Sequence, residues 1–224
     1  MTIRSIGPHK VRHGDATTPG AIDELVGGRK IPILYTDPPW GDAHIKYFAT
    51  LNKKQTGQDV EPTSMDSLLA AIGEAARKHV SHYLVVEYGL RWRDAVQAFG
   101  VDAGFRPRGV FPTFYGSKPK SKGGGRYPMD LHLFTRTDAE PVPSGWAEGV
   151  TGTHGYETVR AALAPLADAC REMDGAPSPC VMDVCCGFGT TARAATELGL
   201  TFLGNELNAT RMAKTVLRLK QESK

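Results

Sequence analysis

The sequence predicts an α/β domain with a central, largely parallel sheet. Six short apolar runs rich in β-branched and aromatic residues recur along the chain, and stretches with helical spacing lie between them. Strands that alternate with helices in this way are typical of a parallel sheet with helices on its faces. The expected strands are residues 33–35, 83–86, 110–115, 131–134, 181–184 and 201–203.

Besides the helix that follows the glycine turn described below, three helices are expected between or after these strands. The first follows a capping-box pattern that runs from Thr63 to Asp66, with Asp in the usual Glu position, and another begins near Asn208. A third helical pattern contains Pro165, where we expect the helix to start or to kink. The apolar faces of the first and last helices comprise Leu68, Leu69, Ile72, Ala75 and Ala76, and Met212, Val216 and Leu219.

Three stretches are predicted to be loops, at residues 41–62, 116–128 and 138–155. Each mixes polar residues with glycine or proline. Ligands of open α/β sheets bind at the carboxyl ends of strands, so the first two loops are suited to act as lids or substrate clamps. The third is expected to be a linker between two halves of the sheet.

The composition indicates one globular domain of 224 residues, with 41% hydrophobic and 23% charged residues. No apolar run approaches the ~20 residues that cross a bilayer, and the first ten residues lack the apolar stretch of a signal peptide. We therefore expect a cytoplasmic protein without a membrane partner. The four cysteines lack Cys-x-x-Cys spacing or a histidine cluster, which predicts reduced thiols and no metal site.

The sharpest chemical signal is Asp37-Pro38-Pro39-Trp40, which follows the expected strand at residues 33–35. An amino group conjugated to a base ring is a poor nucleophile, because its lone pair is delocalised into the ring. The Asp37 carboxylate and the Pro38 carbonyl can accept its two N–H bonds, and the consecutive prolines hold a rigid turn. Trp40 offers a flat face for an extruded base. The alternative is a proline-rich turn with a core tryptophan.

A glycine turn near the C-terminus gives the second signal. Residues 183–191 run from an expected strand through Gly187 and Gly189 into an expected helix. The glycines permit a tight turn and close approach of a ligand, and the helix start offers free N–H groups. Glu206 ends the next strand, where a carboxylate can accept both ribose hydroxyls of a nucleoside cofactor. An ordinary βα turn and a solvated strand end are the alternatives.

A weaker third signal is His13-Gly14-Asp15. An Asp beside a Gly at a turn is more often a structural Asx turn than a ligand contact. Taken alone, this tripeptide does not distinguish the two.

Together, these motifs resemble those of the amino-methyltransferase family of DNA methyltransferases, which modify N6 of adenine or N4 of cytosine. The likeness spans nearly the whole chain in the circularly permuted order, with the catalytic motif before the cofactor motif. Asp37 to Trp40 is similar to the family's Asp-Pro-Pro-aromatic motif, and residues 183–191 are similar to Asp-Pro-Phe-Cys-Gly-Ser-Gly-Thr-Thr. Residues 199–206 look like the following strand and ribose-binding acid, and Asp15 like an aspartate that contacts the cofactor's adenine.

The resemblance implies a Rossmann-like fold of S-adenosylmethionine-dependent methyltransferases over residues 1–224. It divides the chain into a catalytic half, 1–137, a linker or reduced target-recognition segment, 138–155, and a cofactor-binding half, 156–224. The implied catalytic residues are Asp37, Pro38, Pro39 and Trp40. The implied contacts to S-adenosyl-L-methionine come from Asp15, Asp37, Asp183, Cys185, Gly187, Gly189, Thr190, Thr191 and Glu206.

The cofactor half also departs from the family pattern. Cys185 stands where Phe is usual, and Phe188 stands where a small Ser is usual. Residues 154–159 lack the lysine of the common His-Pro-x-x-Lys-Pro segment. The resemblance therefore does not predict how this segment closes over the cofactor.

A basic segment between two expected strands is the candidate nucleic-acid contact. The net charge of +3 is too small to indicate a polyanionic partner, but residues 106–126 contain no Asp or Glu. The expected phosphate contacts are Lys118, Lys120, Lys122 and Arg126. Ordinary solvated lysines are the alternative. Since 138–155 is short for a separate recognition domain, sequence specificity is expected to be minimal, or to come from loops or a second subunit of a homodimer.

The leading interpretation is methyl transfer to the exocyclic amine of adenine in DNA. Asp37, in place of a Ser, favours adenine, whereas Trp40 also occurs in enzymes that act on RNA adenosine. RNA adenosine and N4 of cytosine therefore stay as alternative targets. A further alternative is a catalytically silent subunit that binds nucleic acid.

Overall fold

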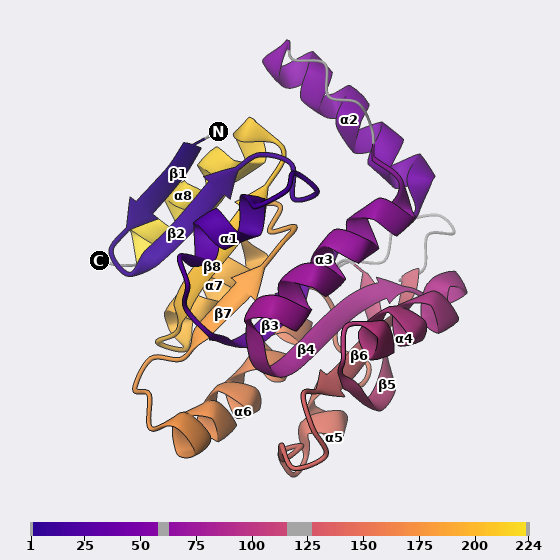
Figure 1. Ribbon diagram of the computed structural model, residues 1–224, viewed down its shortest axis with the longest axis vertical. Helices are drawn as coiled ribbons and strands as arrows, with labels where there is room; N and C mark the ends of the chain where they lie inside the picture. The colour runs from indigo at the N-terminus through magenta and orange to yellow at the C-terminus, as the bar shows by residue number, and fades with distance from the viewer. Residues whose placement is uncertain (1, 58–62, 116–126, 223–224) are drawn as a thin grey trace.

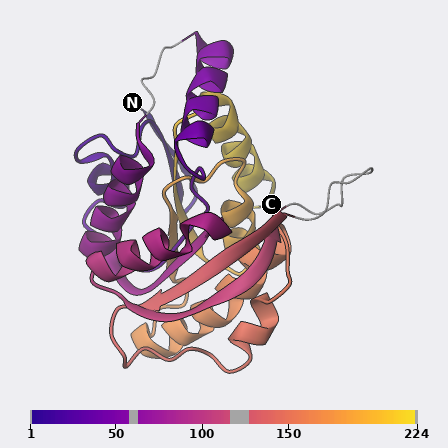
Figure 2. The ribbon, with the colours of Figure 1, turned by 90° about the vertical axis from the view of Figure 1, so that its right-hand side faces the viewer.

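The computed structural model describes residues 2–57, 63–115 and 127–222, which form one mixed sheet of eight strands between two helical layers (Figures 1 and 2). The strand order is β1-β2-β8-β7-β3-β4-β6-β5. The five from β2 to β4 in this order run parallel, and β1, β6 and β5 pair antiparallel at the two edges. The strands are β1 (Thr2–Ile6), β2 (His9–His13), β3 (Ile31–Thr36), β4 (Val80–Gly89), β5 (Arg106–Tyr115), β6 (Tyr127–Thr135), β7 (Cys180–Asp183) and β8 (Thr201–Glu206).

Helices cover both faces of this sheet, as predicted. One core packs α5 to α8 against one face, and a second core packs α1, α3 and α4 against the other. In β4, Tyr83 and Val85 point into the first core, and Leu84 and Val86 into the second. A central strand is therefore a continuous apolar run. The helices are α1 (Ala21–Val26), α2 (Asp42–Thr56), α3 (Met65–His79), the 3-10 turn η1 (Leu90–Trp92), α4 (Arg93–Asp102), α5 (Trp146–Val150), α6 (Tyr156–Asp174), α7 (Thr190–Glu197) and α8 (Ala209–Glu222).

All six predicted strands are confirmed, but the N-terminal hairpin was not predicted. β1 and β2 pair in antiparallel register around a two-residue turn, with Ile6 opposite His9. β1 lies at the edge of the sheet and is mostly exposed, so its sequence lacks the apolar run that marks the central strands. Gly7, with φ 54°, gives the turn its left-handed residue.

The prediction of a loop at residues 41–62 is wrong over most of its length, because residues 42–56 form α2. Gly57 ends the helix in a left-handed conformation with its N–H on the Lys53 carbonyl, and Asp42 lies in the first turn. α2 extends beyond the end of the sheet (Figure 1). The predicted loop at 138–155 likewise contains α5, whose Trp146 is buried and donates its indole N–H to the Ala162 carbonyl.

Two helix boundaries also differ from the prediction. The N-cap of α3 is Ser64 rather than Thr63, since the Ser64 hydroxyl accepts the Ser67 N–H at 3.1 Å. α6 begins at Tyr156 and continues through Pro165 instead of starting there. The start of α8 is as predicted: the Asn208 side chain accepts the Arg211 N–H at 3.0 Å.

The site is determined by the reversal of winding between β7 and β3. From β7 the chain continues through α7 to β8 on one side, and from β3 through α2 and α3 to β4 on the other. Ligands of open α/β sheets bind at the carboxyl ends of the strands where this reversal occurs. Asp37 directly follows β3 and Asp183 ends β7, so the two motifs meet there.

Candidate active site

A cavity of about 830 Å³ opens at the carboxyl ends of β3, β4, β7 and β8. This volume is in the range of small-molecule and cofactor sites. The predicted site residues that line it are Asp15, Asp37, Pro38, Pro39, Trp40, Asp183, Cys185, Gly187, Thr190, Thr191 and Glu206. Gly189 is not in the wall, and Lys118, Lys120, Lys122 and Arg126 lie outside the described residues.

The Asp37–Trp40 turn is held by hydrogen bonds that leave two acceptors for a ligand. The Trp40 indole N–H donates to Asp37 Oδ1 at 3.0 Å, and the Tyr88 hydroxyl donates to the Pro39 carbonyl at 2.7 Å. Within the described part of the chain, no group donates to Asp37 Oδ2 or to the Pro38 carbonyl. Those two oxygens are therefore available to an amine.

Aromatic rings surround this turn. Trp40 packs edge-to-face against Tyr115 at 5.1 Å between ring centroids and lies 5.6 Å from His44. Because its N–H is bound to Asp37, the indole is fixed relative to the carboxylate. A planar ligand near Asp37 thus meets an ordered aromatic wall.

Two carboxyl groups in this part of the cavity have strongly raised pKa values. Burial raises the pKa of Asp37 to about 7, and the charge of Asp183 adds to the rise, while the Trp40 hydrogen bond opposes it. Glu87, at the end of β4, has a pKa of about 8 because of its burial and the nearby charge of Asp37. Desolvation and like charge together favour the protonated forms.

The carboxylate of Asp183 is fully engaged by the chain itself. It accepts the Thr191 hydroxyl at 2.6 Å, the Cys185 N–H at 3.0 Å and the Thr36 hydroxyl at 3.1 Å. Burial raises its pKa to about 6, and these hydrogen bonds limit the rise. Asp183 thereby ties β7, the glycine turn, α7 and β3 together.

The glycine turn itself is built around Glu206. Each carboxylate oxygen accepts one backbone N–H at 2.8 Å, from Gly187 and from Asn208. Gly187 and Gly189 have φ values of 54° and 79°, a region that favours glycine. A Cβ at Gly189 would also lie 2.9 Å from the Thr215 side chain, so this glycine permits the close approach of α8. Gly189 therefore acts on packing behind the turn.

Asp15 forms an Asx-type turn, the structural alternative considered for it. Its Oδ1 accepts both the N–H and the hydroxyl of Thr17, each at 2.8 Å. The residue still lines the cavity, close to the carboxyl end of β2. The two roles are thus compatible.

Comparison with known proteins gives the fold. No protein-family model and no curated protein matches the sequence. Among solved structures, M1.HpyAVI in complex with S-adenosylmethionine (SAM) superposes with a TM-score of 0.66 and 16% identity, over 93% of this chain and 98% of the other. PvuII DNA methyltransferase, which is cytosine-N4-specific, superposes with a TM-score of 0.60 and 14% identity, over 96% and 90%. This is a methyltransferase fold.

A third similar structure is TTHA0409 from Thermus thermophilus, assigned as a DNA modification methylase and complexed with SAM. It has a TM-score of 0.60 and 16% identity, over 95% of each chain. At such identities the likeness concerns the fold alone.

Several residues of the cavity wall were missed by sequence reasoning. Glu87 could have been noticed as an acid at the carboxyl end of a strongly apolar strand, a common position for ligand contacts in this fold class. Ile45 and Phe48 recur at helical spacing in α2, a signal that the neighbouring glycines and proline obscured. The Arg211 guanidinium lies between the Phe48 and Phe188 rings, at 4.3 and 4.8 Å from their centroids.

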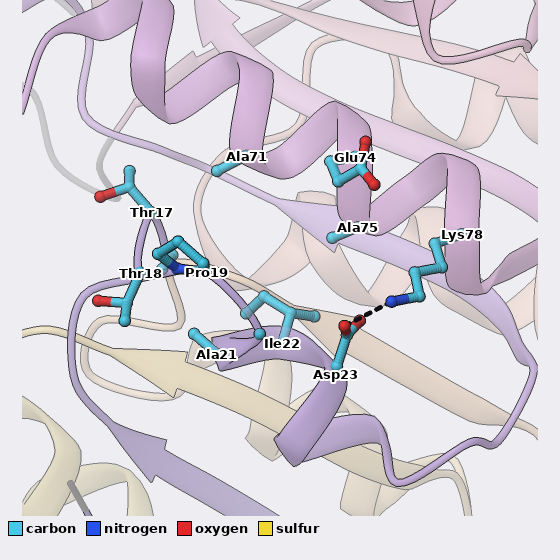
Figure 3. Close-up of a pocket in the computed structure, with 12 residues that line it drawn as sticks. Thr17, Thr18, Pro19, Ala21, Ile22, Asp23, Ala71, Glu74, Ala75 and Lys78 are labelled. Atoms are coloured by element: carbon cyan, nitrogen blue, oxygen red, sulfur yellow. Dashed lines mark hydrogen bonds and ion pairs between the residues drawn. The ribbon is translucent and has the colours of Figure 1, made fainter.

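A second, smaller cavity of about 270 Å³ lies between α1 and α3 (Figure 3). Its charged groups are already paired: Asp23 forms ion pairs with Lys78 and His79. This cavity contains none of the predicted site residues. The chemistry therefore concentrates in the larger cavity.

The described residues contain neither a metal-ligand cluster nor a membrane-spanning helix. Within residues 2–57, 63–115 and 127–222, no three His, Cys, Asp or Glu side chains gather as metal ligands. The same residues include no helix with the length and apolar character needed to span a bilayer. The four cysteines are free thiols, and Cys170 and Cys186 are buried.

Proposed function

We propose that this protein transfers a methyl group from SAM to the exocyclic amine of a base in DNA, with adenine as the leading target. The observation that carries the proposal is the pair of free acceptors, Asp37 Oδ2 and the Pro38 carbonyl, in the same cavity as the glycine turn and Glu206. The methyltransferase fold supports it.

The residues of the cavity fit SAM by charge and by shape. Arg211 is the only Lys or Arg among the described residues of the wall. Five acidic side chains line the same wall: Asp15, Asp37, Glu87, Asp183 and Glu206. An acidic cavity stabilises a bound sulfonium cation. Glu206 can accept the ribose hydroxyls with its remaining lone pairs, and Asp15 reaches the cavity from the β2 side.

The proposed chemistry needs only positioning and lone-pair localisation from the chain. Bound SAM supplies an electrophilic methyl group. Asp37 and the Pro38 carbonyl accept hydrogen bonds from the two N–H groups of the target amine, which draws its lone pair out of the ring and aims it at the methyl. The N–C bond would form as the S–C bond breaks, S-adenosylhomocysteine would leave as the neutral thioether, and the methylated nitrogen would lose one proton to solvent. Trp40 holds the extruded base by stacking. The edge-to-face contact between Trp40 and Tyr115 supports this geometry.

The direct test is incubation with radiolabelled SAM and unmethylated DNA, RNA or free nucleosides, followed by nucleoside mass spectrometry. We expect label in DNA, as N6-methyladenine. Binding of SAM without transfer to any substrate would contradict the proposal and favour a silent nucleic-acid-binding subunit.

One observation supports cytosine as a second candidate target. The fold superposes on the cytosine-N4-specific PvuII methyltransferase with a TM-score of 0.60 over 96% of this chain. The amine of cytosine has the same two N–H bonds, so the Asp37–Pro38 acceptors suit it equally. The same mass spectrometry separates N4-methylcytosine in DNA from N6-methyladenine in DNA or RNA.

We further propose that Lys118, Lys120, Lys122 and Arg126 contact nucleic-acid phosphates. In sequence they follow Tyr115, which lies in the cavity wall. Each lost phosphate contact lowers the slope of log affinity against log salt by about 0.7 to 0.9. The triple Lys→Ala variant at 118, 120 and 122 is therefore expected to flatten the slope. The control, Lys30→Ala with Lys220→Ala at two exposed positions outside the cavity wall, leaves it unchanged. An unchanged slope in the triple variant removes this segment from the interface.

A further inference from the structure

Glu87 is a buried carboxyl group in the cavity that the proposed methyl transfer does not yet use. It ends the apolar part of β4, is only 4% exposed and lines the cavity together with Asp37. In the described part of the chain no Lys or Arg pairs with it; its oxygens accept hydroxyl groups, from Tyr35 at 2.8 Å and from Thr113 at 3.4 Å. Burying an ionised carboxylate with only neutral partners is costly, so this environment favours the protonated form.

The surroundings of Glu87 favour its protonated form. The groups that face it are Asp37 after β3, Tyr35 in β3, Thr113 in β5 and, at longer range, Tyr115. None carries positive charge, and two nearby carboxyls do not both ionise in such a site. The ionised form of Asp37 is the stronger acceptor for an amine N–H, and the hydrogen bond from Trp40 favours that form. The remaining proton therefore belongs to Glu87, whose pKa of about 8 agrees with this assignment.

A protonated carboxyl is a hydrogen-bond donor, and the target base offers an acceptor at the matching place. Adenine has the unprotonated N1 next to its amine, and cytosine has N3. We propose that Glu87 recognises the target base by donating its carboxyl O–H to this ring nitrogen while Asp37 accepts from the amine. The inference rests on the proposed function and deepens it.

Asp37 and Glu87 would then together recognise one hydrogen-bonding pattern on the base, an amine donor beside a ring acceptor. Enzymes that act on extruded bases commonly recognise them by hydrogen bonds to this edge. Thymine presents a carbonyl beside a ring N–H, which would place acceptor against acceptor at Asp37 and donor against donor at Glu87. Glu87 and Asp37 would thus exclude thymine without any contact to neighbouring bases.

The test uses an oligonucleotide in which 1-deazaadenine, which lacks N1, replaces the target adenine. We expect kcat/KM of the wild type to fall on the order of 10- to 100-fold on this substrate, because the buried donor loses its acceptor. Glu87→Ala is expected to lose a similar factor on adenine and to discriminate less than about twofold between the two bases. Leu68→Ala, a matched loss of a buried side chain in the cavity wall, should keep the wild-type discrimination ratio.

A second variant keeps the test decisive if Glu87→Ala does not fold. Glu87→Gln has a permanent N–H donor, so it should discriminate against 1-deazaadenine and should stay active above pH 8, where the wild type loses its donor. If mass spectrometry identifies cytosine as the target, 3-deazacytosine takes the place of 1-deazaadenine.

The possible failures are separable. Equal discrimination by the wild type and Glu87→Ala, or an equal loss of activity above pH 8 in the wild type and Glu87→Gln, would overturn the role of Glu87 alone. A wild type that methylates no base in DNA or RNA would overturn the proposed function, and the inference with it.

Discussion

The cofactor side and the target side of the cavity are both lined by buried acids, but the carboxyl groups on the two sides accept different hydrogen bonds. On the cofactor side, Asp183 accepts three donors and Glu206 two, all from the chain itself. On the target side, Asp37 has a single donor and Glu87 has two hydroxyls. The pKa of Asp183 accordingly rises only to about 6, whereas those of Asp37 and Glu87 reach about 7 and 8.

This difference separates two uses of a buried carboxyl group. The cofactor-side acids organise the backbone, so their removal should affect folding or cofactor binding. On the target side, one oxygen of Asp37 accepts from no described group, and one of the two hydroxyls on Glu87 lies as far as 3.4 Å away. Carboxyl groups with raised pKa values and weak partners are candidates for contact with a substrate. Substitutions on the cofactor side should therefore lower stability or SAM affinity, whereas substitutions on the target side should lower the rate of methyl transfer.

The largest expected effect is on catalysis, from Asp37→Ala. The amine would lose the acceptor that draws its lone pair out of the ring, so single-turnover methylation should fall by about a thousandfold, or ~4 kcal/mol in the barrier. SAM affinity measured by calorimetry should stay within about twofold to threefold of wild type, since other residues hold the cofactor. Methylation at a near wild-type rate would show that the catalytic assignment is wrong.

The next effect is on stability, from Asp183→Ala. Three donors would be left without their acceptor inside the protein, so the free energy of unfolding should fall by about 2 to 4 kcal/mol. Urea unfolding measures this. The control is Glu74→Ala, which breaks an exposed ion pair with Arg77 within α3 and should cost less than about 1 kcal/mol. Equal losses in the two variants would contradict the structural role of Asp183.

A smaller effect is expected from Glu206→Ala, on cofactor binding. The variant loses the proposed acceptor for the ribose hydroxyls, and SAM binding should weaken by ~1.5 to 3 kcal/mol. Glu206→Gln, which keeps one acceptor oxygen, should lose less. At saturating SAM both variants should methylate at close to the wild-type rate. If the methylation rate stays low at saturating SAM, Glu206 acts on the target base rather than on the cofactor.

The sequence predicted the parts of this fold whose signals are local. Central strands such as β4 are apolar on both faces, and the edge strand β5 still carries an aromatic and β-branched run at residues 110–115, so six strands could be located without knowing their neighbours. The edge strand β1 and the projecting α2 bury fewer side chains, and their patterns are correspondingly weaker. β2 is buried, but two of its buried residues, His9 and Arg12, are polar, so it lacks an apolar run. The capping hydroxyl of α3 shifted by one residue, to Ser64, because Thr63 and Ser64 can both cap and packing decides between them.

The site was predictable where function needs consecutive residues. Asp37 to Trp40 and the glycine turn carry their chemistry within one turn of chain each. Glu87 has no such motif: its position depends on the parallel pairing of β3 with β4, in which Thr36 lies opposite Val86. Arg211 and Phe48 meet only because α2 and α8 pack together, held by Asn208 on Gln55 at 2.8 Å. Such pairs depend on tertiary structure.

The smallest expected effect comes from Glu87→Gln. Unlike Asp183→Ala, this substitution should raise the free energy of unfolding, and it should do so at high pH. The pKa of Glu87 is raised from 4.5 to about 8 in the fold, so between these pH values the folded state binds more protons than the unfolded state. Stability therefore falls as pH rises through this window. Gln avoids the penalty, and we expect a gain of about 1 to 2 kcal/mol at pH 9 and almost none at pH 4. The gain stays below the full linkage value because Asp37 and Glu87 share a proton over part of the range.

Urea unfolding of wild type and Glu87→Gln at pH 4 and 9 measures this difference. The control is Glu148→Gln, at an exposed position of α5, which should change stability by less than about 0.5 kcal/mol at either pH. A Glu87→Gln variant that is less stable than wild type at pH 9 would mean that the ionised carboxylate is well satisfied in the fold. Glu87 would then resemble Asp183 and Glu206, and the contrast between the two sides of the cavity would rest on Asp37 alone.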